Sequence, residues 1–155
     1  MSEYTLDTNI LINLERRYPR DIFPGVWEAV ELLADEQRGC ICREVLEELT
    51  LGGDNLQNWA KTLNGFVCEV TDDEVTIVVE ISAAHPDWVQ GQRNAADPWL
   101  IAHASVSSRT IVTEETRAGA GVIDANQKVP NVATEHQVET LTFFEFARAE
   151  GWSFG

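Results

Sequence analysis

The sequence predicts an α/β fold built around a central parallel sheet. Short apolar runs of strand type alternate along the chain with longer segments whose apolar residues recur at helical spacing. This alternation is typical of βαβ units, in which successive strands lie parallel. No internal repeat, low-complexity tract or linker divides the 155 residues, so we expect a single domain that spans 1–155.

Each expected element follows from its local pattern. Strands are expected at short apolar or β-branched runs, namely 4–6, 40–42, 66–70, 110–113 and 138–141. Helices are expected where apolar residues recur every three or four positions, namely 9–15, 26–36, 44–51, 54–63, 73–84, 98–107 and 143–150, with one helical turn after 129–132.

Turn residues set the ends of several helices. Tyr18-Pro19 stops the first helix, Gly39 follows the second, and Gly52-Gly53 terminates the third. Asp54 or Asn55 is expected to cap the fourth. The segment 73–84 fits two structures, because its β-branched residues suit a strand while its isoleucines recur at four-residue spacing. We expect a helix there.

Composition and charge exclude several classes of protein. Hydrophobic residues make up 44% of the chain, which excludes a disordered protein. No apolar stretch reaches the ~18 residues of a transmembrane helix, and no signal peptide is visible. We therefore expect a cytoplasmic protein without a membrane partner. The formal net charge of −15 repels bulk nucleic acid, so a nucleic-acid substrate would require metal and a local basic patch.

The cysteines and histidines give no metal-binding signature. An odd, small number of cysteines is typical of reduced cytosolic thiols. The histidines share no ligand spacing with them, so we expect no zinc site. These residues are Cys40, Cys42, Cys68, His85, His103 and His136.

Four acidic residues stand at or near the ends of apolar runs: Asp7, Glu48, Asp97 and Glu115. If the runs are neighbouring parallel strands and the helices they feed, the four carboxyl groups converge at one edge of the sheet. Converging carboxylates repel one another and need a hard divalent cation between them. A metal held in this way can generate hydroxide and bind phosphate.

Each acidic residue also has a purely structural interpretation. Asp7 or Thr8 could cap the helix that begins near Asn9. Asp97 precedes Pro98, and a capping Asp often precedes a proline at the first helical position. Thr8 and Asn9 could instead orient the carboxylate of Asp7 by hydrogen bonds.

The second acidic position has three candidates. At ~100° per residue, Val45, Leu46 and Leu49 centre one apolar stripe of the helix. Glu48 lies at the border of this stripe, whereas Glu44 points further out and Glu47 lies nearly opposite. We therefore choose Glu48 and keep Glu44 as the alternate.

The fourth position has two candidates. Glu115 follows the strand that ends at Thr113, and Glu114 is its competitor. Either could be a surface acid. Thr113 could hydrogen-bond a carboxylate or a water molecule.

Taken together, these motifs resemble the PIN domain family, and more narrowly its small VapC-type toxin ribonucleases of toxin–antitoxin pairs. The resemblance covers nearly the whole chain. Its motifs are Asp7-Thr8-Asn9, Glu48-Leu49, Ala96-Asp97-Pro98-Trp99-Leu100-Ile101-Ala102 and Val112-Thr113-Glu114-Glu115. Glu115 departs from the family pattern, in which the fourth acid is usually Asp.

The resemblance implies a three-layer, Rossmann-like α/β/α sandwich and a Mg²⁺- or Mn²⁺-dependent endoribonuclease. It implies that Asp7, Glu48, Asp97 and Glu115 form the metal-binding and catalytic set. The expected partners are RNA and an antitoxin protein, and a homodimer is left open. Arg16, Arg17 and Arg20 form the only tight basic cluster; they are either a solvated helix end or the cations that neutralise phosphates beside the cut.

Two other functions compete with this interpretation. An aspartyl-phosphate phosphohydrolase would use Asp7 as nucleophile, but that chemistry usually needs a second carboxylate where Asn9 stands. A non-catalytic PIN-like domain that binds a partner protein is favoured by the acidic charge and by Glu115 in place of Asp. RNA cleavage that depends on Mg²⁺ and on Asp7 separates the three.

Overall fold

One parallel sheet forms the centre of the molecule, in the strand order β3-β2-β1-β4-β5. The computed structural model describes residues 3–155; Met1 and Ser2, which the expected domain included, lie outside this range. The strands are β1 (Tyr4–Leu6), β2 (Gly39–Cys42), β3 (Val67–Cys68), β4 (Thr110–Val112) and β5 (Thr140–Leu141). The chain adds β2 and β3 on one side of β1 and then crosses to β4 and β5 on the other, so the strand order reverses between β1 and β4.

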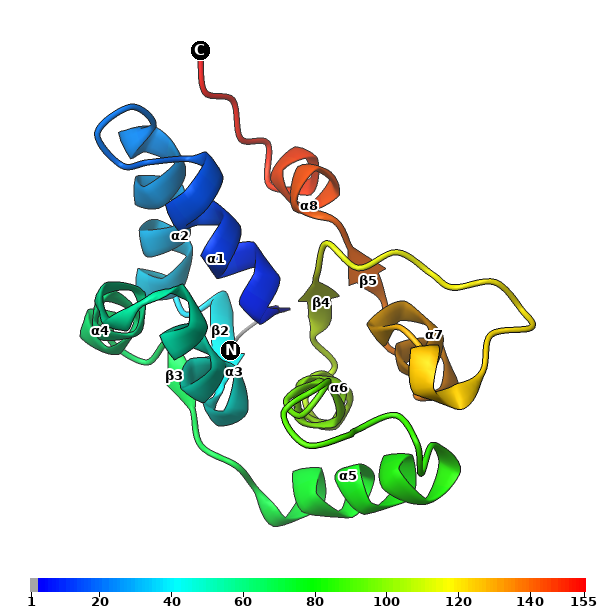
Figure 1. The fold of residues 1–155 in the computed structure, drawn as a ribbon. Helices are drawn as coiled ribbons and strands as arrows, with labels where there is room; N and C mark the ends of the chain where they lie inside the picture. The colour runs from blue at the N-terminus through cyan, green and yellow to red at the C-terminus, as the bar shows by residue number, and fades with distance from the viewer. Residues whose placement is uncertain (1–2) are drawn as a thin grey trace.

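Helices cover both faces of this sheet (Figure 1). They are α1 (Thr8–Arg17), α2 (Pro24–Asp35), α3 (Arg43–Glu48), α4 (Asp54–Thr62), α5 (Asp72–Ala84), α6 (Asp97–Val106), α7 (Val129–Glu135) and α8 (Phe143–Ala149). Helix α6 packs on β1, β2 and β4, and α5 packs on α6. Helices α1, α2 and α8 lie on the opposite side of the sheet (Figure 1). The predicted three-layer α/β/α sandwich is confirmed.

Apolar side chains in the core pack α6 against the sheet. Leu100 and Ile101 of α6 have no exposed surface, and neither do Leu6 of β1 and Ile111 of β4. Burying such side chains stabilises the fold by roughly 1.5–3 kcal/mol each. This packing fixes the N-terminus of α6 against the ends of the two central strands. No helix in the described part of the chain is long and apolar enough to cross a membrane.

Several predicted boundaries are corrected. The segment 44–51 is not one helix: α3 ends at Glu48 and a 3-10 turn covers Leu49–Gly52. Neither Asp54 nor Asn55 caps α4, because Gly53 takes the N-cap position with a φ of 101°, a conformation that favours glycine. The strands expected at 66–70 and 138–141 shrink to two residues each, β3 and β5, since only those residues pair with a neighbouring strand.

The ambiguous segment 73–84 is the helix α5, as predicted. A capping box decides the outcome: the Thr71 hydroxyl accepts the backbone N–H of Glu74, and the Glu74 carboxylate accepts the backbone N–H of Thr71. Two orphan donors at the helix start are satisfied in this way. Local capping therefore outweighs the β preference of the valines and isoleucines.

A charged network ties the end of α5 to α7. His85 Nδ1 lies 2.6 Å from Asp124 Oδ1, and His85 Nε2 lies 2.8 Å from Glu135 Oε1. Carboxylates only accept hydrogen bonds, so this arrangement favours the imidazolium form, in which both ring nitrogens donate. Burial lowers the pKa of His85, but the hydrogen bonds to Glu135 and Asp124 prevail and raise it above its ordinary value.

We predict that His85→Gln destabilises the protein most in mild acid. A raised histidine pKa contributes stability that is fully present below the unfolded pKa of about 6.5 and is lost as pH rises through the folded pKa. The melting temperature of the variant should be about 3–6 °C lower below pH 6.5, for a loss of one to two kcal/mol, and the difference should shrink at alkaline pH. His136→Gln is the control, since His136 forms no ion pair in residues 3–155. A difference that stays constant with pH would contradict the assignment.

Candidate active site

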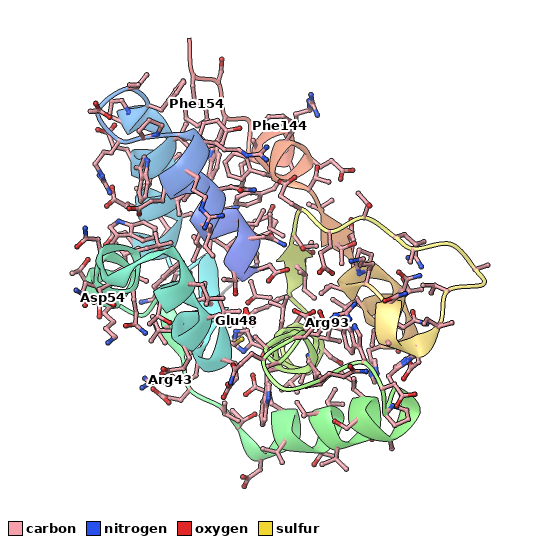
Figure 2. All side chains as sticks on the ribbon, in the orientation of Figure 1. Arg43, Glu48, Asp54, Arg93, Phe144 and Phe154 are labelled. Atoms are coloured by element: carbon pink, nitrogen blue, oxygen red, sulfur yellow. The ribbon has the colours of Figure 1, made fainter. Side chains whose placement is uncertain are left out.

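The four predicted acidic residues line one cleft at the carboxyl edge of the sheet. Asp7 directly follows β1, Glu48 ends α3, Asp97 begins α6 and Glu115 follows β4. The cleft has a volume of about 330 Å³. Its lining is Asp7, Thr8, Asn9, Ile12, Asn13, Arg16, Glu48, Asn94, Asp97 and Glu115. Figure 2 labels Glu48 between α3 and α6. The cleft opens where the strand order reverses, which is where open α/β sheets bind ligands.

Asp7 has both of its expected roles at once. As N-cap of α1, its Oδ1 accepts the backbone N–H of Thr8 at 2.7 Å. Its Oδ2 accepts the Thr113 hydroxyl at 2.8 Å and the Asn9 side-chain amide at 3.2 Å. These three bonds fix the carboxylate in one orientation, and they leave part of its accepting capacity open. Thr8, Asn9 and Thr113 thus contact the site in the manner proposed for orienting groups.

Asp97 does not act as a helix cap. The N-cap of α6 is Ala96, and Asp97 is already the first helical residue. Only 8% of Asp97 is exposed, yet its carboxyl group receives no hydrogen bond from any residue in 3–155. Its oxygens are not among the fully enclosed unpaired side-chain atoms of the described residues, so they face the cleft that Asp97 lines. A carboxylate in this position fits an exogenous cation.

The carboxylate of Glu48 is positioned by α1. Its Oε2 accepts the Thr8 hydroxyl at 2.8 Å, which leaves Oε1 without a hydrogen-bond partner among residues 3–155. Glu44 is half-buried but does not line the cleft, and the exposed Glu47 pairs with Arg43 at 3.3 Å. The register argument that favoured Glu48 over its neighbours agrees with this geometry.

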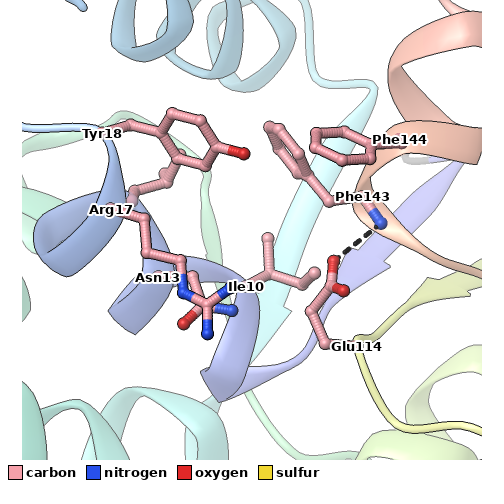
Figure 3. Close-up of a pocket in the computed structure, with 8 residues that line it drawn as sticks. Ile10, Asn13, Arg17, Tyr18, Glu114, Phe143 and Phe144 are labelled. Atoms are coloured by element: carbon pink, nitrogen blue, oxygen red, sulfur yellow. Dashed lines mark hydrogen bonds between the residues drawn. The ribbon is translucent and has the colours of Figure 1, made fainter.

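The two glutamates after β4 point to different places. Glu115 lines the cleft, and its Oε2 accepts the backbone N–H of Val129 at the start of α7 at 2.7 Å. Glu114 Oε1 instead accepts the backbone N–H of Phe143 at 3.0 Å. Figure 3 shows Glu114 facing Phe143 in a separate small pocket that also contains Arg17. The carboxylate of Glu114 is therefore held at the start of α8 by this hydrogen bond.

The clustered charges strongly perturb the two aspartates. Burial, together with the charges of Glu115 and Glu48, raises the pKa of Asp7 to about 7, against the hydrogen bonds of Thr113 and Thr8. Without a cation, the ionised form of Asp7 is costly near neutral pH.

Asp97 is perturbed in the same direction. Burial first, and then the charges of Asp7, Glu115 and Glu48, raises its pKa well above the ordinary value, and only Lys128 opposes this. All the donors are oxygens, which are the ligands of hard cations such as Mg²⁺ and Mn²⁺. The residues present therefore fit such an ion.

Arg16, Arg17 and Arg20 do not share one surface of the protein. Arg16 lines the cleft, whereas Arg17 lines the pocket of Figure 3. Arg20 is bound to Glu31 by two hydrogen bonds of 3.1 and 3.0 Å and lies over the ring of Trp27. Only Arg16 of the three contributes a cation to the cleft.

Asn13 and Asn94 line the cleft without having been nominated from the sequence. Asn94 has a φ of 60°, and its side-chain amide donates to the carbonyl oxygen of Trp88 at 2.9 Å. Its backbone carbonyl accepts the N–H of Asp97 at 3.1 Å. Asn is enriched in this left-handed conformation, so the Asn94 turn before α6 was the signal available in the sequence.

Comparisons with known proteins agree with this architecture. The family model described as Domain of unknown function (DUF4411) matches residues 4–154. No curated protein matches the sequence. Among solved structures, VapBC2 from Rickettsia felis bound to a promoter DNA fragment is similar with a TM-score of 0.55 and 17% identity, over 90% of this chain and 97% of that chain.

Two further structures are similar. FitAcB from Neisseria gonorrhoeae has a TM-score of 0.52 and 18% identity, over 89% of this chain and 96% of that chain. A toxin–antitoxin complex from Klebsiella pneumoniae has a TM-score of 0.51 and 20% identity, over 78% and 93%. The resemblance to VapC-type PIN domains is confirmed at the level of the fold.

We predict that Asp97→Asn stabilises the metal-free protein at neutral and alkaline pH. A carboxyl whose folded pKa is raised contributes stability below its unfolded pKa of about 3.9 and loses it as pH rises through the folded pKa. In EDTA at pH 8, the variant should melt about 3 °C or more above the wild type, and the gain should shrink toward pH 4. Saturating Mg²⁺ should raise the wild-type melting temperature by mass action.

The control for this measurement is Asp54→Asn, because Asp54 is exposed at the start of α4 and lies outside the cleft (Figure 2). It should not stabilise the protein at pH 8. An Asp97→Asn variant that melts below the wild type at pH 8, or equally above it at pH 4 and pH 8, would show that the carboxylates do not repel as described.

Proposed function

The chain belongs to the DUF4411 family, and we propose that it is a Mg²⁺- or Mn²⁺-dependent endoribonuclease that serves as the toxin of a toxin–antitoxin pair. The observation that carries this proposal is the Asp97 carboxylate, which receives no hydrogen bond from any residue in 3–155 and lines one cleft with three further carboxylates. A site of this composition requires cations to hold its charge, and a phosphodiester substrate brings further negative charge that the same cations can neutralise.

The proposed role of each carboxylate follows from the lone pairs that remain free after its hydrogen bonds within the protein. Asp7 and Asp97 would hold the metal ion directly. Glu48, fixed by Thr8, would complete the shell or orient a water molecule, and Glu115 would hold a second ion or the attacking water. A divalent cation bound there supplies Lewis-acid polarisation of a phosphate oxygen and lowers the pKa of bound water.

Side chains of the protein orient the carboxylates of the cleft. Thr113 Oγ1 donates to Asp7 Oδ2 and accepts the backbone N–H of Glu115 at 3.1 Å. One hydroxyl thereby links two of the carboxylates across β1 and β4. Groups that orient metal ligands are typically worth 10–100-fold in metal affinity or activity.

The similar solved structures support the toxin part of the proposal. One of them is a toxin–antitoxin complex, and VapBC2 was solved with a DNA fragment from its promoter. By analogy, we propose an antitoxin protein as partner and RNA as substrate, in the cytoplasm, with a homodimer as a further assembly to test. At 17–20% identity, these structures support the fold. The proposed chemistry rests on the acidic cleft.

We predict that Asp97→Asn lowers RNA cleavage by roughly 100-fold or more, equivalent to about 3 kcal/mol of barrier. This variant is cleaner than Asp7→Asn, because Asp7 accepts three hydrogen bonds that an amide would disturb. The purified chain is incubated with a pool of cellular RNA in Mg²⁺, Mn²⁺ or EDTA, and new 5′ ends are mapped by sequencing. Cleavage should need the cation.

Two glutamates of α3 provide a matched pair of variants. Glu48→Gln should reduce cleavage strongly, whereas Glu44→Gln, one turn earlier on α3 and outside the cleft, should retain it. Metal binding without any cleavage by the wild type would favour a non-catalytic, partner-binding domain. Undiminished cleavage by a folded Asp97→Asn protein would remove the metal site from the mechanism.

We predict that Arg16→Glu weakens RNA binding and flattens its salt dependence, because Arg16 is the arginine that lines the cleft. Losing one phosphate contact should reduce the slope of log K against log salt by about 0.7–0.9. Binding is measured by fluorescence anisotropy with the Asp97→Asn protein at several salt concentrations. Arg17→Glu is the control of equal charge, and equal losses in both variants would indicate a long-range field effect.

A further inference from the structure

A second group of metal-binding side chains lies outside the carboxylate cleft. Cys40 belongs to β2, Cys68 ends β3 and His103 belongs to α6, which packs on β2. One ligand atom from each lies within 4.8 Å of the others. The sequence spacing gave no reason to expect this proximity, because parallel pairing and helix packing join positions that are far apart in the chain.

His103 is held in the tautomer that a metal ligand needs. Its Nδ1 lies 2.6 Å from Glu74 Oε1, and because a carboxylate only accepts, Nδ1 carries the proton. Nε2, the nitrogen left to bind a metal, lies 3.2 Å from Cys40 Sγ. A histidine whose second nitrogen donates to a carboxylate is the usual arrangement behind a metal-bound imidazole.

Glu74 is itself fixed. Its Oε2 accepts the backbone N–H of Thr71 at 2.6 Å in the capping box of α5, and only 4% of the residue is exposed. The start of α5 therefore positions the carboxylate that positions His103. A helix cap alone does not require a buried histidine, so this double use of Glu74 is a separate indication of a built site.

The charges balance for a divalent ion. Two thiolates neutralise one M²⁺, and Arg109 lies beside the site, where its Nη1 donates to the carbonyl oxygen of His103 at 2.9 Å. Cys40 and His103 are 0% and 2% exposed, whereas Cys68 is half-buried. An ion can enter on the Cys68 side, where a water molecule can complete the shell.

We propose that Cys40, Cys68 and His103 bind a zinc ion. Thiolate and imidazole ligands select borderline and soft cations, whereas the all-oxygen cleft selects hard ones. With bonds of about 2.3 Å to sulfur and 2.0 Å to nitrogen, tetrahedral zinc keeps its donors roughly 3.5–3.8 Å apart. The present spread of up to 4.8 Å closes with a movement of about 1 Å in the donor atoms.

This site is independent of the proposed nuclease. His103 lies six residues after Asp97 on α6, roughly 9 Å along the helix axis. The zinc ion would join β2, β3 and α6, and so secure the two strands on one side of the sheet to the helix that carries Asp97.

The test is titration of the reduced, metal-stripped protein with Co²⁺, followed by displacement with Zn²⁺. One equivalent of Co²⁺ should produce the near-ultraviolet charge-transfer absorption of thiolate ligands. Saturating Zn²⁺ should also raise the melting temperature by about 5–10 °C. Excess Mg²⁺ should displace neither ion, because the ligand preferences of the two sites differ.

Variants locate the site. Cys68→Ser, at the half-buried position, should abolish the absorption, whereas Cys42→Ser, at the third cysteine, should preserve it. Glu74→Gln retains a side chain suited to the capping box but presents an amide to His103, and should weaken Zn²⁺ affinity by about 10–100-fold. Asp97→Asn should give the same thiolate absorption with Co²⁺ as the wild type, which separates this outcome from the fate of the carboxylate cleft.

The proposal is overturned if the reduced protein gives no thiolate absorption with Co²⁺. It is also overturned if a folded Cys68→Ser protein binds Co²⁺ and Zn²⁺ as tightly as the wild type. Quantitative formation of a Cys40–Cys68 disulfide in air, combined with no metal uptake after reduction, would assign the two thiols to redox chemistry instead.

Discussion

The mutual repulsion of buried carboxylates is the constraint on which the rest of this structure depends. Asp7 and Asp97 are 4% and 8% exposed. The charges of Glu115 and Glu48 raise the cost of ionising both, and the charge of Asp7 raises it further for Asp97. The surrounding packing holds them together: β1 and β4 are paired in the centre of the sheet, and α6 is buried against both. Hydrogen bonds from Thr8, Asn9 and Thr113 compensate Asp7, whereas Asp97 has no such compensation. This asymmetry makes Asp97 the position where an added cation would relieve the most strain.

Much of the fold could be predicted because its signals are local. The opening run Tyr4–Leu6 followed by Asp7 marks the first strand and its helix, and glycine and proline mark the helix ends. The register of α3 separated Glu48 from Glu47 and Glu44, since an apolar stripe fixes which side of a helix faces the core. These inferences needed only the spacing of apolar residues along the chain and the residue types that favour turns.

What could not be predicted depends on contacts between distant residues. Whether Glu114 or Glu115 enters the cleft is decided by the starts of α8 and α7, which capture one glutamate each. Adjacent arginines likewise diverge, because successive residues of α1 point about 100° apart. The meeting of Cys40, Cys68 and His103 leaves no trace in their spacing, since strand pairing and helix crossing create it.

The brevity of β3 and β5 also determines how this molecule can associate. Each outermost strand has only two residues, so the sheet presents almost no row of unpaired backbone groups to a foreign strand. Fibril-like stacking and capture of an extended peptide by strand addition are both disfavoured at such borders. A companion chain must therefore gain its affinity mainly from exposed side chains, among them Phe144 of α8 and Phe154 of the segment after it (Figure 2).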